Sequence, residues 1–255
     1  MSNKSVAIIL PCLFFGIAFC LISCDENQQE VVIAMGFSGG HYLEVANLDT
    51  LSNLSQMNMS VEIWASGDAS EAETARPLLF LGNSSGGTEV AFYRGVDDSS
   101  LVSVYVRDQL FGQFNVSGLD WRRAAVHYLC LTRFKTRFSF YFDGKLLKQE
   151  YITVSDQGNV YYNMLIGSDN TNYWRGTVRE VRLWSKKLES SEVVFHHRRP
   201  DKLTEHYSPT GLDNLEGLWR FQEETTDLVL DASKNDNHAY IHGDPSSIFW
   251  IYGLN

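Results

Sequence analysis

Carboxylate side chains are the residues of this 255-residue chain that could carry out hydrolytic chemistry. Cleavage of a sugar bond requires two carboxyl groups, about 5 Å apart in enzymes that retain configuration, and acids at alternate positions of one strand would supply them. The E-x-D-x-x-E signature of such a pair is absent from the sequence. The acids in or beside expected strands, none with a second acid two residues away, are Glu62, Glu180, Glu216 and the pair Glu223 and Glu224. We therefore expect strand-end or solvent-facing acids and no enzyme.

Histidine and cysteine give little support for metal or thiol chemistry. His196 and His197 are adjacent and lack the H-E-x-x-H spacing of a zinc site. Neighbouring residues on a helix point about 100° apart, so they are poor joint ligands. The stretch from His196 to Arg199 is expected to be the solvated end of a helix. Cys130 lies in an apolar run and is expected to be a small buried hydrophobe without a disulfide.

Three segments are rich in the oxygen ligands that calcium prefers, which number six to eight around the ion. Asp169 and Asn170 are the preferred pair, because they directly precede a long strand pattern. The same side chains are also frequent in Asx turns, and this alternative stays open. The three segments contain Asp97 and Asp98; Asp169, Asn170 and Asn172; and Asp231, Asn235, Asp236 and Asn237.

Aromatic residues surround the Asp169 segment. Aromatic rings stack on sugars when polar groups lie nearby, so this cluster predicts a glycan platform; packing in the core is the alternative. The expected ligand-binding residues are Tyr161, Tyr162, Asp169, Asn170, Asn172, Tyr173 and Trp174. Four other aromatic residues are expected in the core: Trp64, Trp184, Trp219 and Phe221.

The elements that must position these residues are strands. Val61, Ile63 and Ala65 alternate with Glu62 and Trp64, which predicts a strand with the two sets on opposite faces. Similar alternation recurs along the chain, with turn residues at Lys135 to Thr136 and Asp143 to Gly144. Short strands at this spacing with almost no helix indicate a two-sheet sandwich or barrel.

The stretch from Trp174 to Val193 combines a strand, a turn and a short helix. Its apolar positions change parity between Val178 and Val181, so a regular strand would put them on opposite faces. A β-bulge or twist is therefore expected between them. Val181, Leu183 and Trp184 are expected to pack into the core.

The N-terminus resembles a bacterial lipoprotein signal. Lys4 is followed by an apolar run, which ends in Leu21-Ile22-Ser23-Cys24 and is shorter than the roughly 20 residues of a spanning helix. We expect a signal peptide over 1–23, acylation of Cys24 with an acidic tether over 24–30, and a folded domain over 31–255. The expected location is the bacterial cell envelope, in the outer membrane or at the cell surface rather than the inner membrane. A net charge of −10 argues against nucleic acid as a partner.

Several blocks resemble laminin-G-like, concanavalin A-like jelly-roll domains, in the expected order. These blocks are Tyr42 to Val45, Ser60 to Ala65, Phe140 to Lys145, Leu165 to Gly167, Arg175 to Trp184, Leu218 to Phe221 and Asp231 to His238. The resemblance implies an all-β, two-sheet antiparallel jelly-roll sandwich with one short helix after the 176–184 strand. Relatives often carry calcium, but Gly39 and Gly40 here replace their usual Asp or Asn.

The resemblance, together with the missing acid pair, predicts a non-catalytic binding module in the cell envelope. Its ligand would be a glycan or a protein partner, and its membrane contact would be the lipid on Cys24. A glycoside hydrolase or lyase with an atypical acid pair is one alternative. A structural subunit of a cell-surface assembly is another.

Overall fold

The structure is a computed structural model that describes residues 30–46, 48, 58–68, 76–83, 87–95, 101–116, 125–153, 162–203, 209–225 and 227–254. The expected signal peptide and Cys24 lie outside these residues. The chain divides into a main unit, Val32–Ile251, and a second unit, Met1–Val31 with Tyr252–Asn255. Within the described ranges, no helix has the length and apolar character needed to cross a membrane.

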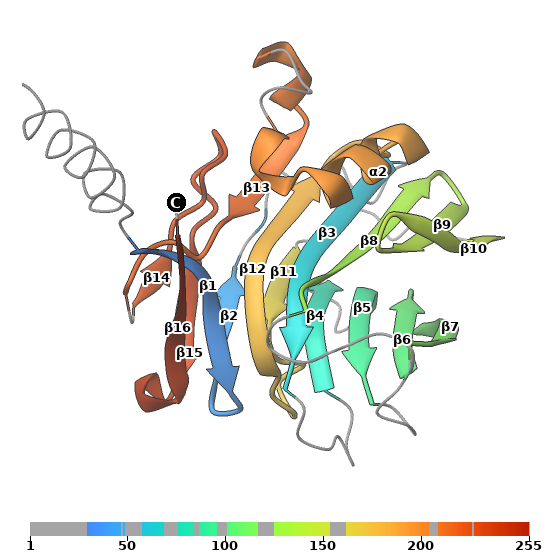
Figure 1. Cartoon of the computed structure of the whole chain (residues 1–255). Coiled ribbons are helices and arrows are strands. Elements are labelled where there is room, and N and C mark those ends of the chain that lie inside the picture. Colours follow the sequence, from blue (N-terminus) through green and yellow to red (C-terminus); the bar gives the residue numbers. More distant parts are fainter. Residues whose placement is uncertain are drawn as a thin grey trace, which may run out of the picture. The chain divides into compact units, whose positions relative to one another are not determined.

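Two antiparallel sheets form the main unit (Figure 1), as the alternating pattern predicts. Sheet A has the order β10-β9-β8-β3-β12-β1-β16, and β13 also pairs with β12. Its strands are β1 (Glu30–Ser38), β3 (Asn58–Gly67), β8 (His127–Phe134), β9 (Arg137–Phe142), β10 (Lys145–Tyr151), β12 (Arg175–Trp184), β13 (Leu215–Trp219) and β16 (Ile248–Leu254).

Sheet B has the order β14-β15-β2-β11-β4-β5-β6-β7. Its strands are β2 (His41–Val45), β4 (Arg76–Asn83), β5 (Thr88–Arg94), β6 (Leu101–Val106), β7 (Gln109–Asn115), β11 (Tyr162–Ile166), β14 (Leu228–Val229) and β15 (Ala239–Gly243). The all-β jelly-roll sandwich expected from the sequence is confirmed.

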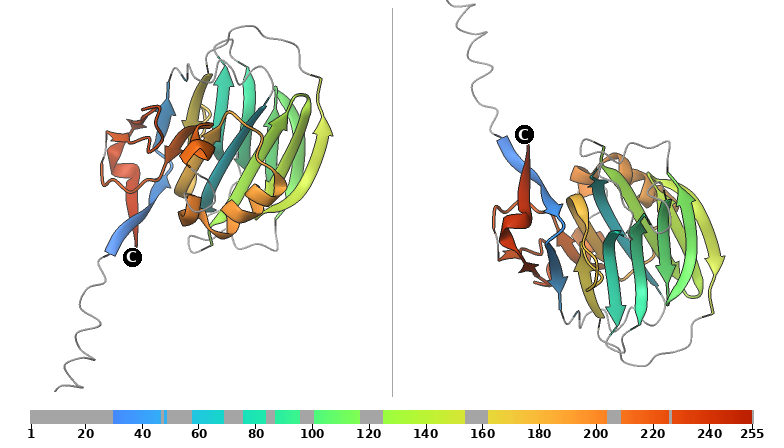
Figure 2. Two further views of the ribbon diagram at one scale, coloured as in Figure 1. Left: turned by 90° about the horizontal axis from the view of Figure 1, so that it is seen from above. Right: turned by 90° about the horizontal axis from the view of Figure 1, so that it is seen from below.

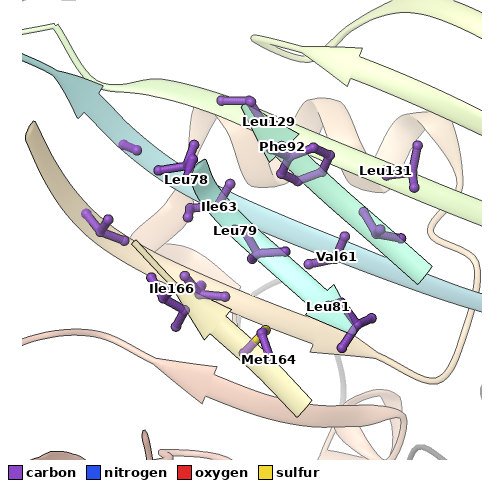
Figure 3. Close-up of a cluster of buried hydrophobic side chains, with 14 of the residues drawn as sticks. Val61, Ile63, Leu78, Leu79, Leu81, Phe92, Leu129, Leu131, Met164 and Ile166 are labelled. Carbon is purple, nitrogen blue, oxygen red and sulfur yellow. The ribbon is translucent and has the colours of Figure 1, made fainter. Parts of the chain in front are cut away.

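The main core lies between the sheets. Strand alternation sends every second side chain inward, so Val61 and Ile63 of β3 meet Leu79 and Leu81 of β4 and Phe92 of β5 in one buried cluster (Figure 3). Trp219 and Phe221 are also buried there. Both were expected core residues.

Strand β12 contains the expected irregularity. Its register against β3 shifts between Val178 and Glu180, so Arg179 is the extra residue of a β-bulge. Because the bulge adds one residue, Val178 and Val181 face the same side of the sheet. Val178, Val181 and Leu183 all pack in the main core. The prediction of a bulge between Val178 and Val181 is confirmed.

A second cluster lies on the opposite face of sheet A, under α2 (Ser190–Arg198) and the residues that follow it. Figure 2 shows this helical segment in front of the strands from above and behind them from below. Short 3-10 helices follow at η2 (Pro200–Lys202), η3 (Pro209–Leu212) and η4 (Pro245–Ser247). Helix α2 begins with a capping box, in which the backbone N–H of Glu189 donates to the Glu192 carboxylate at 2.7 Å. Trp64 and Trp184 pack in this cluster and not in the main core.

Candidate functional site

The outer face of sheet B carries side chains that alternate with those of the main core. Residues directly opposite one another on neighbouring strands share a face. Glu44 of β2 lies opposite Tyr240 and Leu165, and Tyr42 lies opposite His242. The same face continues across the sheet through Leu165 to Phe80, Ala91 and Tyr105. This surface is rich in aromatic rings, and we call it the aromatic face.

Three rings form one group on the aromatic face. The rings of Tyr42 and His242 stack with their centroids 5.2 Å apart and an interplanar angle of 20°. The Tyr173 ring is tilted against Tyr42, with a centroid distance of 6.3 Å. Nε2 of His242 lies 3.3 Å from the Glu44 carboxylate. Partial burial, together with the neighbouring Glu44 and Tyr173, raises the pKa of Tyr42. The protonated hydroxyl can donate a hydrogen bond to a ligand.

The turn before β12 brings Tyr173 to this group. Ser168 and Tyr173 form an isolated β-bridge, and Asp169 Oδ1 accepts the backbone N–H groups of Thr171 and Asn172 at 2.9 and 2.8 Å. Asn170 adopts the left-handed region with φ 70°. Asp169 also accepts a hydrogen bond from Tyr93, and burial followed by this carboxylate raises the pKa of Tyr93. The Asx turn, the expected alternative to a metal loop, is therefore present.

The Asp169 turn offers a calcium ion a single carboxylate. Calcium requires six to eight oxygen ligands, and Asp169 supplies the one carboxylate between positions 168 and 174. One of its oxygens already accepts two backbone N–H groups. In the part of the chain that the structure describes, no three His, Cys, Asp or Glu side chains are grouped as metal ligands.

Two of the expected ligand-binding rings are in the wrong place for a ligand. Tyr162 and Trp174 are fully buried in the main core, because Tyr162 shares the inward parity of Met164 and Ile166 on β11 and Trp174 packs beside Gly176. Neither ring presents a face to solvent, so assigning them to a glycan platform was wrong. Tyr161 lies outside the described residues. Asn170 is exposed, and Asp169, Asn172 and Tyr173 are partly exposed, at the edge of the aromatic face.

Glu62 is buried and was wrongly expected to face solvent. Its carboxylate accepts hydrogen bonds from the Tyr128 hydroxyl at 2.5 Å and the Trp184 indole N–H at 2.6 Å, and His196 Nδ1 lies at 2.8 Å. Burial acts to raise the pKa of Glu62, but His196, Arg182 and the Tyr128 hydrogen bond outweigh it and lower the pKa to about 2. His196 is likewise fully buried, whereas it was expected at a solvated helix end. This acid ties α2 to sheet A and is inaccessible to a substrate.

Glu180 borders a cavity. It is largely buried, forms ion pairs with Arg182 and Arg220, and its pKa is raised by burial. The cavity measures about 180 Å³ and is also lined by Asp201 and Arg179. Glu180 was also expected to face solvent, and that expectation is wrong.

Glu216 and Asp231 organise the C-terminal loop. Asp231 accepts the backbone N–H groups of Leu218, Ser233 and Asn237 at 2.8 to 2.9 Å. The backbone carbonyl of Glu216 accepts the Asn237 side-chain amide at 2.8 Å, and its side chain is buried. The third Asp- and Asn-rich segment therefore folds as a hydrogen-bonded turn, and Glu216 does not face solvent.

Residues 36–40 read Gly-Phe-Ser-Gly-Gly, the G-x-S-x-G spacing of a nucleophile elbow. The structure places them at the end of β1 and in the turn that leads to β2 of the other sheet, and not in the strand-to-helix turn of such an elbow. The Ser38 hydroxyl donates to the Ser247 carbonyl at 2.7 Å. This motif is a structural connection between the two sheets.

The partners Tyr42, Glu44 and His242 were not among the expected site residues. β2 and β15 are far apart in the sequence, and alternation alone does not say which strands are neighbours. The signal available was the outward parity of Tyr42 and Glu44 within β2.

Comparisons with known proteins agree with this architecture. The family model of the concanavalin A-like lectin/glucanases superfamily matches residues 37–194. A search of curated proteins found no match. One similar solved structure is a "putative carbohydrate binding protein" from Bacteroides ovatus, with 12% identity and a TM-score of 0.54, covering 89% of this chain and 60% of that one.

Two further solved structures are similar. The receptor binding domain of botulinum neurotoxin mosaic serotype C/D has 13% identity and a TM-score of 0.51, covering 69% of this chain and 45% of that one. Trypanosoma rangeli sialidase has 16% identity and a TM-score of 0.47, covering 58% of this chain and 23% of that one. This chain thus spans 60% or less of each of the three structures, and at such identities the likeness concerns the fold alone. Because the family model covers more than half of the sequence, the chain belongs to the concanavalin A-like lectin/glucanases superfamily.

Proposed function

We propose that the protein is a non-catalytic binding module whose ligand is a glycan, bound on the aromatic face beside Tyr42, Tyr173 and His242. The observation that carries this proposal is the packed group of rings next to Glu44 at a partly exposed position. The C–H face of a sugar stacks on such rings, while carboxylate and amide groups bind its hydroxyls. The superfamily, and a solved structure of similar fold described as a "putative carbohydrate binding protein", support a glycan as the ligand. No metal ion is part of the proposal.

Replacing Tyr42 with alanine is expected to weaken glycan binding at least about tenfold, which corresponds to roughly 1.4 kcal/mol. Tyr42 contacts both other rings, so its removal leaves His242 and Tyr173 without a shared neighbour. Binding would be measured on a glycan array and then by calorimetry with the best ligand. The matched control is Phe134→Ala, which removes an exposed ring from sheet A. An equal loss in both variants, or no glycan bound by the wild-type chain, would count against the site.

One observation favours hydrolysis as the second candidate: Glu180, with its raised pKa, borders a cavity together with Asp201. A carboxyl group whose pKa is raised by burial holds its proton more firmly than an ordinary glutamate, which suits general acid catalysis. Sugar release from envelope polysaccharides, lost in Glu180→Gln and kept in Tyr42→Ala, would replace the non-catalytic proposal.

For location, we propose lipid anchoring to the bacterial cell envelope through Cys24, supported by the Leu-Ile-Ser-Cys ending of the apolar run. Two or more acyl chains hold a protein stably at a membrane. Mass spectrometry of the native N-terminal peptide is expected to show an acylated Cys24 as the first residue. An unmodified Cys24, or a chain that still begins at Met1, would contradict the anchor.

A further inference from the structure

Strand β10 lies at the end of sheet A and has one strand neighbour, β9, in the described part of the chain. Three of its seven residues are exposed apolar side chains: Leu146 is 45% exposed, Leu147 36% and Tyr151 70%. A free strand edge with apolar side chains is a template for pairing with another chain.

The direction of the backbone groups on β10 follows from one hydrogen bond. The N–H of Ile152 donates to the Thr136 carbonyl of the β8–β9 turn at 2.8 Å, so Ile152 points its backbone groups toward β9. In antiparallel pairs this direction alternates along the strand. Gln149 and Tyr151 therefore point their N–H and C=O groups away from β9, toward the open edge.

The sequence of this edge is complementary to itself when it is reversed about Gln149. Lys148 and Glu150 flank Gln149, and Leu147 and Tyr151 lie one position further out. If a second copy pairs antiparallel with Gln149 opposite Gln149, each Lys148 lies opposite a Glu150. Leu147 is the extra residue of a β-bulge against β9, so the regular pairing covers the segment from Lys148 to Glu150. Opposite charges in directly opposite positions are stabilising.

Neighbouring registers are excluded by geometry or by charge. If one copy slides so that Gln149 lies opposite Lys148, a residue whose backbone groups point away from β9 would face a residue whose backbone groups point toward β9. Antiparallel pairing does not allow this combination. If the pairing is centred on Lys148 or on Glu150 instead, two like charges lie directly opposite one another. Such pairs are destabilising. The register about Gln149 is thus the one that satisfies both backbone and side chains.

We propose that β10 pairs with β10 of a second copy of this chain, antiparallel and with Gln149 on the two-fold axis. Lys148 and Glu150 of one copy already lie 2.6 Å apart and are partly exposed, so in the pair each charge gains a second opposite charge across the axis. Such an isologous contact closes with two copies and does not propagate. The dimer carries two aromatic faces and would bind a multivalent ligand with avidity; the pairing itself does not depend on the glycan proposal.

The first test is disulfide trapping of the full chain carrying Gln149→Cys. Paired residues on the axis have Cα atoms about 5 Å apart, within reach of a disulfide. The matched control is Lys145→Cys on the same strand, whose two copies would be separated by eight residues, roughly 25 Å. Wild type controls for the native cysteines. Mild oxidation is expected to give a covalent dimer with Gln149→Cys alone, and equal cross-linking of the two variants would overturn the proposal.

The second test exchanges the charges. Lys148→Glu and Glu150→Lys each place like charges opposite one another and are expected to reduce the dimer fraction at least tenfold in analytical ultracentrifugation. The double variant restores complementarity and is expected to restore the dimer. If the double variant stays monomeric, the register is wrong. If the wild type is monomeric at micromolar concentration, the proposed dimer is overturned.

Discussion

Replacing Glu62 with alanine is expected to destabilise the protein by about 3–5 kcal/mol, the usual effect of breaking a buried charged network. The change removes the buried carboxylate that accepts hydrogen bonds from the Trp184 indole N–H and the Tyr128 hydroxyl and that pairs with His196. Urea unfolding would measure the loss. The backbone amides of α2 are expected to exchange their hydrogens faster, because His196 joins that helix to the Glu62 carboxylate.

The control for this change is Glu44→Ala, which removes the same residue type from a partly exposed strand position. Its ion pair with His242 is near the surface, so the expected loss is at most about 1 kcal/mol. Similar losses in the two variants would show that Glu62 is not the centre of a buried network.

The same carboxylate gives a pH signature. The folded pKa of Glu62 is about 2 and its ordinary value is 4.5, so the unfolded state takes up a proton first as the pH falls. The contribution of Glu62 is therefore complete above pH 4.5 and disappears as the pH falls toward 2, and it amounts to about 3 kcal/mol. Wild type and Glu62→Ala are expected to converge in stability across this interval, and a constant difference would contradict the role of the charge.

Replacing Gly176 with alanine is expected to lower the free energy of unfolding by about 2–5 kcal/mol, through backbone strain and overpacking together. Gly176 has φ +144°, and a Cβ there would lie 2.1 Å from the Ser66 carbonyl oxygen and 3.0 Å from the Trp174 indole nitrogen. The first contact is with the backbone of β3, which cannot move aside without breaking the central pairing of sheet A. Thermal and urea unfolding would measure the effect.

Gly112→Ala is the matched control for Gly176. Gly112 lies in the edge strand β7, and a Cβ there would meet the far end of the Phe114 ring at 2.7 Å, which a small rotation relieves. A cost below about 1 kcal/mol is expected for this control. If Gly176→Ala is as stable as the wild type, the backbone at the start of β12 can accommodate a Cβ and the expected strain is absent.

Local pattern was enough to predict most of the fold. Alternation placed Val61 and Ile63 in the main core, and the parity change between Val178 and Val181 predicted the bulge at Arg179. These features depend on neighbours in sequence. The sequence could not show that the outward face of β3 is also buried, because the helix that covers it presents His196, 134 positions from Glu62.

The candidate site was only partly predictable for the same reason. Tyr173 and the Asp169 turn could be found, since turn chemistry is local. Trp174 could not be separated from Tyr173 without knowing which of the two adjacent rings enters the core. Tyr42 and His242 become neighbours only through the pairing of β2 with β15, which joins the two ends of the domain.

The central position of β12 also sets the order of folding. β3 and β12 are adjacent in sheet A, yet Glu62 and Trp184 are 122 positions apart. The β8–β9–β10 hairpins can close as soon as they leave the ribosome, whereas β3 has no partner on its other side until residue 184 has been synthesised. Chains dominated by such distant pairings fold slowly, in about milliseconds to seconds, so the nascent protein spends this interval with the β3 edge open to chaperones or to misassembly.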